Sequence, residues 1–142
     1  MAIKLTSQQV ADWSTKFQNL IDDEAGRNLF LQFLKTEFNE ENLLFWLEVE
    51  HFRTLGNSDP AAFAAKAKSI YSGFIKSMVS KEINITAQAR AKIEEELRED
   101  RVSENMFDSA QLEAFGIMHK HSYPRFLVSN VFLAVVESTK DK

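Results

Sequence analysis

The stretch FNEENLLFWLEVE, residues 38–50, divides into two unlike halves. Its second half, LLFWLEV, is as apolar as the middle of a protein core, and apolar residues continue to Phe52 and Leu55. We therefore predict a helix from about Glu40 to Leu55 that is buried on most sides, with Asn39 as its N-cap. The first half, FNEEN, sets an aromatic side chain among two carboxylates and two carboxamides. This polar start of a buried helix needs a separate explanation.

The composition of the chain is that of one soluble domain. A chain of 142 residues buries roughly 70% of its unfolded surface, and 44% apolar content with twelve Phe can supply the core. There is no Cys, which excludes disulfides, thiolate metal sites and Cys nucleophiles. A net charge of -4 argues against a nucleic-acid binder, which normally shows a basic face.

Nothing in the sequence predicts a membrane span, a secretory signal or a lipid anchor. The longest apolar run, VFLAVV at 131–136, is too short to cross a bilayer. The first residues, MAIKLTSQQV, lack the apolar run of a secretory signal. MAIKLT also lacks the Gly needed for myristoylation, and the C-terminal KDK lacks the Cys needed for prenylation. We expect a cytoplasmic protein.

Helical spacing of apolar residues recurs along the chain, and only four Gly and two Pro interrupt it. We therefore predict an all-α fold. Four helix starts have the residues expected of caps: a capping box from Thr6 to Gln9, an N-cap and N1 pair at Asp59-Pro60, an N-cap at Thr86, and a second capping box at Asp108 and Gln111.

Other features predict breaks between helices. Gly26 is expected to interrupt the chain before a helix, and a long helix after Pro60 is expected to extend to Met78. Residues 80–84 are expected to form a connecting loop. Pro124 is expected to interrupt helical structure before a final helix over about residues 126–136.

The sequence shows no apparatus for catalysis. Glu40 and Glu41 are adjacent, so on a helix they point about 100° apart and do not form an acid–base pair. His119 and His121 are two residues apart and have no Cys nearby, which does not match the ligand spacing of known metal sites. No nucleophile elbow, Walker loop or dinucleotide fingerprint is present. We predict that the chain is not an enzyme and has no metal or cofactor of its own.

Three polar positions are not explained by the core. They are residues 39–42 at the start of the buried helix, Asn84 between two isoleucines in a predicted loop, and SYPRF at 122–126. Each has an ordinary structural explanation when taken alone. Together, loops that carry amides, an aromatic and an Arg are typical of an interaction surface.

These positions and their neighbours resemble the regulator of G-protein signalling (RGS) domain family. The resemblance runs from about Gln9 to Val136 through Trp13, FLQFLKTEF, EENLLFW with Glu50, IYSGFI, the loop around Asn84, FDSAQ and SYPRFL. It implies a nine-helix fold in which an antiparallel four-helix bundle, over about 40–120, is joined by a subdomain of terminal helices. Residues 1–142 are then a single RGS domain with a core of about 9–136.

Such a domain is expected to accelerate GTP hydrolysis by a G-protein α subunit (Gα) and so terminate signalling, without chemistry of its own. By the same resemblance, the partner is expected to bring its nucleotide and Mg²⁺, and to recruit the domain, as a monomer, to the inner face of the plasma membrane. The alternative is a scaffold or effector module of the same fold that docks Gα or another partner without accelerating hydrolysis.

Nine residues match the family's Gα-contacting positions, by resemblance alone: Phe38, Asn39, Glu41, Asn42, Asn84, Ile117, His121, Ser122 and Arg125. Asn84 matches the family's loop Asn, which approaches the switch region of Gα. Two of the nine depart from the family pattern, since His121 stands where Asp is most usual and Asn39 where Ser is. Neutral His can accept a hydrogen bond, but protonated His cannot. These departures bear on which Gα is served.

Overall fold

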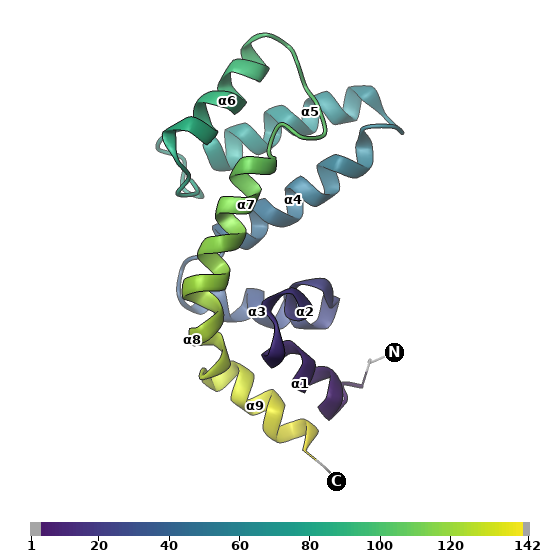
Figure 1. The fold of residues 1–142 in the computed structure, drawn as a ribbon, viewed down its shortest axis with the longest axis vertical. Helices are drawn as coiled ribbons and strands as arrows, with labels where there is room; N and C mark the ends of the chain where they lie inside the picture. The colour runs from purple at the N-terminus through teal and green to yellow at the C-terminus, as the bar shows by residue number, and fades with distance from the viewer. Residues whose placement is uncertain (1–3, 141–142) are drawn as a thin grey trace. The chain divides into compact units, whose positions relative to one another are not determined.

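The protein is described here from a computed structural model in which residues 4–140 are placed. Predictions about terminal lipidation signals, and the ends of the predicted domain 1–142, involve Met1–Ile3 and Asp141–Lys142, which lie outside this range. Within it there is no strand, and the prediction of an all-α fold is confirmed. The α-helices, labelled in Figure 1, are α1 (Ser7–Thr15), α2 (Phe17–Asp22), α3 (Glu24–Thr36), α4 (Glu41–Leu55), α5 (Pro60–Ile70), α6 (Ala87–Arg98), α7 (Asp108–Ile117), α8 (Tyr123–Leu127) and α9 (Asn130–Thr139). The π-helices η1 (Tyr71–Ile75) and η2 (Met118–Ser122) follow α5 and α7.

The chain forms two compact units. The first combines both ends of the chain, up to Glu40 and from Met118 onward, and the second is Glu41–Ile117. The second unit therefore falls within the predicted bundle limits of about 40–120.

The terminal unit is built around aromatic side chains from helices that are far apart in the sequence. Phe30 of α3 meets Phe126 of α8 edge-on, with ring centroids 5.3 Å apart. Phe17 of α2 lies 5.0 Å from Tyr123, whose hydroxyl donates to the Trp13 carbonyl at 2.6 Å. Helices α1 and α9 also pack together (Figure 1). Burial of these large rings supplies most of the unit's stabilisation.

Gly26 lies inside α3, so the prediction that it interrupts the chain is wrong. The residue is buried, and a Cβ added there would lie 2.8 Å from the Leu20 carbonyl oxygen and 3.0 Å from the Trp13 ring. Glycine is therefore present because α3 passes very close to α2 and α1, not because the helix ends.

The second unit is the antiparallel four-helix bundle of α4, α5, α6 and α7, with η1 continuing from α5 (Figure 1). Phe52 of α4 stacks on Phe63 of α5 at 4.4 Å and meets Phe107 edge-on at 5.2 Å. Phe45, one of the residues of the opening motif, is fully buried and contacts Phe74 and Phe107. The apolar half of that motif belongs to the core of this unit, as predicted.

Helix starts at Thr6, Asp59 and Thr86 agree with the predicted caps. The Thr6 capping box forms in full, and the side chains of Asp59 and Thr86 accept backbone N–H bonds from Ala62 and Ala89. The predicted capping box at Asp108 and Gln111 is wrong, because α7 already begins at Asp108 and both side chains bond to Arg53 instead.

Two helix ends also differ from the prediction. The helix after Pro60 does not reach Met78, since α5 ends at Ile70 and η1 at Ile75. Pro124 stands in the first turn of the short helix α8, where a missing N–H is tolerated, and the break falls at Ser129, which caps α9. Among the helices of residues 4–140, none is both long and apolar enough to cross a membrane.

Candidate functional site

The turn that follows α3 explains the polar first half of the opening motif. Phe38 N–H donates to the Lys35 carbonyl at 3.2 Å, and Asn39 N–H donates to the Leu34 carbonyl at 3.1 Å. This is the Schellman pattern that ends a helix, and its left-handed position normally holds Gly. Phe38 occupies it with φ 57°, and the residue is 89% exposed.

Asn39 therefore ends α3 and does not begin α4. Helix α4 starts at Glu41, and the Asn39 Oδ1 atom is buried with no hydrogen-bond donor, so the prediction that Asn39 caps α4 is wrong. The backbone N–H of Asn39 is already committed to the end of α3. A buried amide oxygen without a donor is costly and uncommon.

Glu41 and Asn42 form the first turn of α4 in the bundle unit. Glu41 is half-buried, and its carboxylate lies at the positive end of the helix dipole. Asn42 is only 7% exposed, and its Oδ1 atom also lacks a donor. Asn42, which matches a contact position of the family, is thus mostly buried in this structure.

Arg125 joins the third predicted position to the turn that carries Phe38. Its guanidinium bonds both carboxylate oxygens of Glu37, the closest contact being Nη2 to Oε1 at 2.8 Å, and Nη1 donates to the His121 carbonyl at 2.9 Å. The hydrogen bond to Glu37 raises the pKa of Arg125 despite partial burial. His121 is exposed, and Ser122 is buried at the end of η2.

Asn84 lies in the loop between η1 and α6 of the bundle unit and is exposed. The loop is fixed on both sides of it. Ile83 is buried and its N–H donates to the Phe74 carbonyl at 2.9 Å. Thr86 donates from its N–H and its hydroxyl to the Glu113 carboxylate at 2.7 and 2.9 Å. Ile117, the last residue of α7, is half-buried.

The nine predicted residues thus divide between the two units. In the terminal unit, the Glu37–Arg125 ion pair brings Phe38 and Asn39 together with the segment that holds His121, Ser122 and Arg125. In the bundle unit, Glu41 and Asn42 are adjacent on α4, Ile117 ends α7, and Asn84 comes from its own loop.

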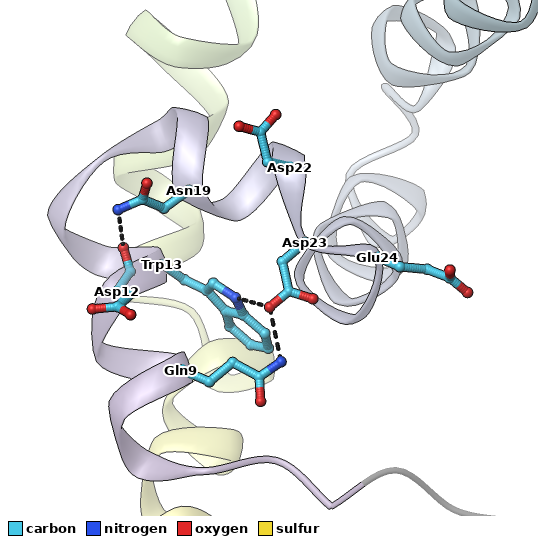
Figure 2. Close-up of a pocket in the computed structure, with 7 residues that line it drawn as sticks. All are labelled: Gln9, Asp12, Trp13, Asn19, Asp22, Asp23 and Glu24. Carbon is cyan, nitrogen blue, oxygen red and sulfur yellow. Dashed lines mark hydrogen bonds between the residues drawn. The ribbon is translucent and has the colours of Figure 1, made fainter.

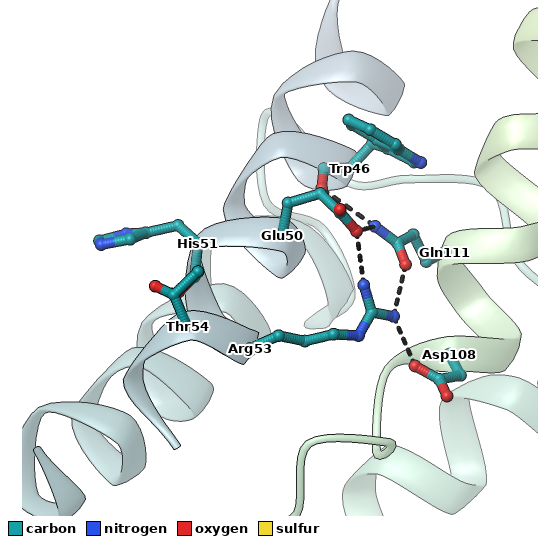
Figure 3. Close-up of polar contacts among 7 residues, drawn as sticks. All are labelled: Trp46, Glu50, His51, Arg53, Thr54, Asp108 and Gln111. Atoms are coloured by element: carbon teal, nitrogen blue, oxygen red, sulfur yellow. Dashed lines mark hydrogen bonds and ion pairs between the residues drawn. The ribbon is translucent and has the colours of Figure 1, made fainter. Parts of the chain in front are cut away.

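Sequence reasoning missed Glu37, whose carboxylate holds Arg125. It also missed the polar network that supports α4 (Figure 3). Gln111, 7% exposed on α7, donates to the Trp46 carbonyl at 3.1 Å and to Glu50 at 2.7 Å, and accepts from Arg53 at 2.6 Å. Arg53 also pairs with Glu50 and Asp108. Glu50 and Gln111, which belong to two of the family-like stretches, are thus in direct contact.

A separate polar hollow of about 710 Å³ in the terminal unit is lined by Gln9, Asp12, Trp13, Asn19, Asp22, Asp23 and Glu24 (Figure 2). Asp23 accepts from Gln9 Nε2 at 2.8 Å and from Trp13 Nε1 at 2.9 Å. Burial alone would raise the pKa of Asp23, but these bonds and those from the N–H groups of Ala25 and Gly26 outweigh it and lower the pKa. The hydrogen bonds among these groups support a structural role that ties α1 to the start of α3.

Known proteins resemble this chain over most of its length. A family model described as "Regulator of G protein signaling domain" matches residues 16–135. The chain is 36% identical over 137 residues to regulator of G-protein signaling 20 from Bos taurus, covering 96% of this chain and 36% of that protein. It is 37% identical over 134 residues to regulator of G-protein signaling 1 from Xenopus tropicalis, covering 94% of this chain and 65% of that protein.

A third relative is regulator of G-protein signaling 19 from Bos taurus, 36% identical over 129 residues, with 91% of this chain and 56% of that protein covered. The chain thus spans between about a third and two thirds of the length of these curated relatives. The family match covers most of the chain and crosses both of its compact units. This chain belongs to the RGS domain family.

Proposed function

We propose that this chain is a GTPase-activating module for heterotrimeric Gα subunits, which binds their switch regions and stabilises the transition state of GTP hydrolysis. The observation that carries the proposal is the turn at Phe38 and Asn39. It combines an almost fully exposed aromatic side chain in a strained backbone conformation with an adjacent amide oxygen that has no donor. Neither feature stabilises the isolated domain, and both suit a bound partner.

The chemistry belongs to the partner. Gα carries its catalytic Arg in cis and a Gln that orients the attacking water. An accessory protein can lower the barrier by interactions that are stronger in the transition state than in the ground state. A hundredfold acceleration requires only about 2.7 kcal/mol, which a few well-placed hydrogen bonds can supply.

Rigidity is what the domain contributes to such bonds. Asn42 is held by a helix whose Phe45 is fully buried, and Asn84 lies next to buried Ile83. Arg125 is oriented by Glu37 before any partner arrives. Groups that are ordered in advance lose little conformational entropy on binding, so more of their interaction energy remains available to the complex.

The proposal treats residues 1–142 as a single binding domain with a core of about 9–136, because the family match crosses both units. Its site is the nine residues that match the family's contact positions: Phe38, Asn39, Glu41, Asn42, Asn84, Ile117, His121, Ser122 and Arg125. The domain acts as a cytoplasmic monomer that Gα recruits to the inner face of the plasma membrane, and the nucleotide and Mg²⁺ remain those of Gα.

Single-turnover GTP hydrolysis by a panel of Gα subunits tests the proposal. Wild-type protein should accelerate at least one of them, and Asn84→Ala should reduce that acceleration by at least about tenfold. Asn57→Ala is the matched control, since Asn57 is another exposed loop asparagine of the bundle unit. Far-UV circular dichroism of each variant verifies the fold. Unchanged hydrolysis rates for every Gα class with wild-type protein would reject GTPase activation.

The second candidate, a scaffold that docks without acceleration, is favoured by His121 and Asn39, which depart from the family pattern at the proposed site. Binding to Gα loaded with GDP, with a GTP analogue, or with GDP and aluminium fluoride separates the two. A GTPase activator should bind most tightly to the aluminium fluoride form, which resembles the transition state. Equal affinity for the last two forms, without acceleration, would support the scaffold.

A further inference from the structure

The loop before Asn84 contains an apolar side chain that neither the core nor the family-matched site explains. Met78 is 93% exposed and has φ 72°. Left-handed backbone is costly for a residue with a Cβ, and an exposed side chain recovers none of that cost by burial. Within residues 4–140, three non-glycine residues have positive φ, and two of them, Phe38 and Met78, are also the two most exposed large apolar residues.

The third left-handed residue, Asp100, follows the end of α6 and is of a type that tolerates this conformation. The coincidence of strain with apolar exposure is therefore specific to Phe38 and Met78. Phe38 belongs to the proposed Gα-binding turn. Met78 shares both unusual properties and lies six residues before Asn84, within about 20 Å along the chain.

Glu82 holds the loop in this conformation. Its Oε1 accepts the Met78 backbone N–H at 3.0 Å, and its Oε2 accepts from Arg90 Nη2 of α6 at 2.8 Å. Its own N–H donates to the Val79 carbonyl at 3.2 Å. One carboxylate thus links the Met78 turn to a helix of the bundle, so that Met78 is displayed from an ordered loop and little entropy is lost when it is contacted.

We propose that Met78 is a specificity-determining contact that enters an apolar depression on Gα beside the surface met by Asn84, and that Glu82 is the positioning residue that presents it. This inference rests on the proposed function. A thioether side chain adapts its shape to an apolar pocket and is common on binding surfaces. Gα subunits that offer such a pocket would bind more tightly than those that present a polar surface there.

A protein pocket fits this loop better than a membrane surface. Stable membrane anchoring requires far more buried apolar area than one side chain supplies. The neighbours of Met78 do not add to it, since Ser77 and Ser80 are exposed and polar and Val79 is half-buried. A single apolar side chain on an ordered loop can instead act as an anchor that fills a pocket on a protein partner.

The test measures affinity for aluminium fluoride-activated Gα with four variants. Met78→Gly relieves the backbone strain and removes the side chain, and Met78→Gln keeps the length but makes it polar. Each should weaken binding by about tenfold, whereas Met78→Leu should stay within about threefold. Leu112→Gln is the control, because Leu112 is 73% exposed on α7 in ordinary helical backbone, and it should bind like wild type. Met78→Gly should melt no lower than wild type.

Glu82 is tested by rescue. Glu82→Ala should weaken binding to activated Gα, whereas Glu82→Gln should retain most of the affinity because an amide oxygen still accepts the Met78 N–H. In a Met78→Gly background, Glu82→Ala should reduce the affinity by a smaller factor than it does in wild type. Equal affinity of wild type, Met78→Gly and Met78→Gln, with Asn84→Ala still impaired, would overturn the inference and leave the proposed function standing. Failure of wild type to bind any Gα would reject both. Met78-dependent binding to phosphatidylserine vesicles, without an effect on Gα affinity, would also overturn the inference.

Discussion

Replacing Phe38 with glycine should separate the stability of the domain from its ability to bind. A buried Phe usually costs about 3–5 kcal/mol of unfolding free energy when it is truncated. Phe38 is 89% exposed, so only about a tenth of its surface is buried. Loss of this small buried area on truncation should cost about 0.5 kcal/mol of unfolding free energy. Glycine also loosens the unfolded chain, at a cost of about 0.4–1 kcal/mol.

Relief of the left-handed conformation acts in the opposite direction. Phe38 has φ 57° at the Schellman position of α3, where a residue with a Cβ costs about 1–2 kcal/mol and glycine costs none. The three contributions nearly cancel. We expect the free energy of unfolding of Phe38→Gly to lie within about 1 kcal/mol of the wild-type value, while affinity for activated Gα falls by about tenfold or more.

Urea unfolding and titration against aluminium fluoride-activated Gα measure the two effects. Phe33→Ala serves as a contrast, because Phe33 lies in α3, the helix that this turn ends, but is only 5% exposed, and its truncation should cost about 3–5 kcal/mol. Phe38→Leu keeps an apolar side chain on the strained backbone and should retain much of the affinity. A loss of more than about 2 kcal/mol in Phe38→Gly, or unchanged affinity in a variant that folds, would show that the reasoning about this turn is mistaken.

Three further predictions concern single residues. Asp23 has a lowered pKa in the folded state, so its stabilising contribution is complete above the unfolded value of 3.8 and is lost as the pH falls through the folded pKa. In thermal melts, Asp23→Asn should therefore lower the melting temperature at pH 7 and reduce the further loss of stability that wild type shows below about pH 4. Gln111→Ala removes partly buried hydrogen bonds to the Trp46 carbonyl, Glu50 and Arg53 and should cost about 1–3 kcal/mol in urea unfolding, and a loss below about 0.5 kcal/mol would contradict the network's role. If His121 accepts a bond from Gα, His121→Gln, which keeps an acceptor, should preserve most of the affinity for activated Gα, and His121→Ala should weaken it.

The helices and their buried faces could be predicted from the sequence because helical periodicity depends on local spacing, whereas the four-helix bundle was expected only from the resemblance to the RGS family. The opening motif already indicated that Phe45 and its neighbours are buried, and the caps at Thr6, Asp59 and Thr86 follow from side-chain chemistry close to each helix start. Gly26 could not be interpreted correctly in this way. Its role depends on the approach of α2 and α1 to α3, which is a tertiary contact.

The candidate site was only partly accessible to sequence reasoning, for the same reason. Family resemblance identified Arg125 and Asn42, but the ion pair of Arg125 with Glu37 joins residues 88 positions apart, and no local pattern predicts it. The left-handed backbone of Phe38 likewise depends on how α3 ends, and the burial of Asn42 is a property of tertiary packing. Phe in a position that favours Gly contradicts the propensity rule, and such exceptions are expected at functional sites.

The π-helical turn η2 precedes α8 directly and affects the rotation of α8 about its axis, which determines the side chain of α8 that faces Glu37 in the proposed binding surface. A π-turn contains one residue more than the α-helical turn it replaces, and one residue corresponds to a rotation of about 100° about the helix axis. Deleting a single residue from Met118–Ser122 would keep every side chain of α8 but turn the helix, so that a different residue would face the carboxylate of Glu37. Within η2, the number of residues therefore determines the proposed surface as strongly as their identity does. Inserting or deleting one residue there should be more disruptive than most substitutions.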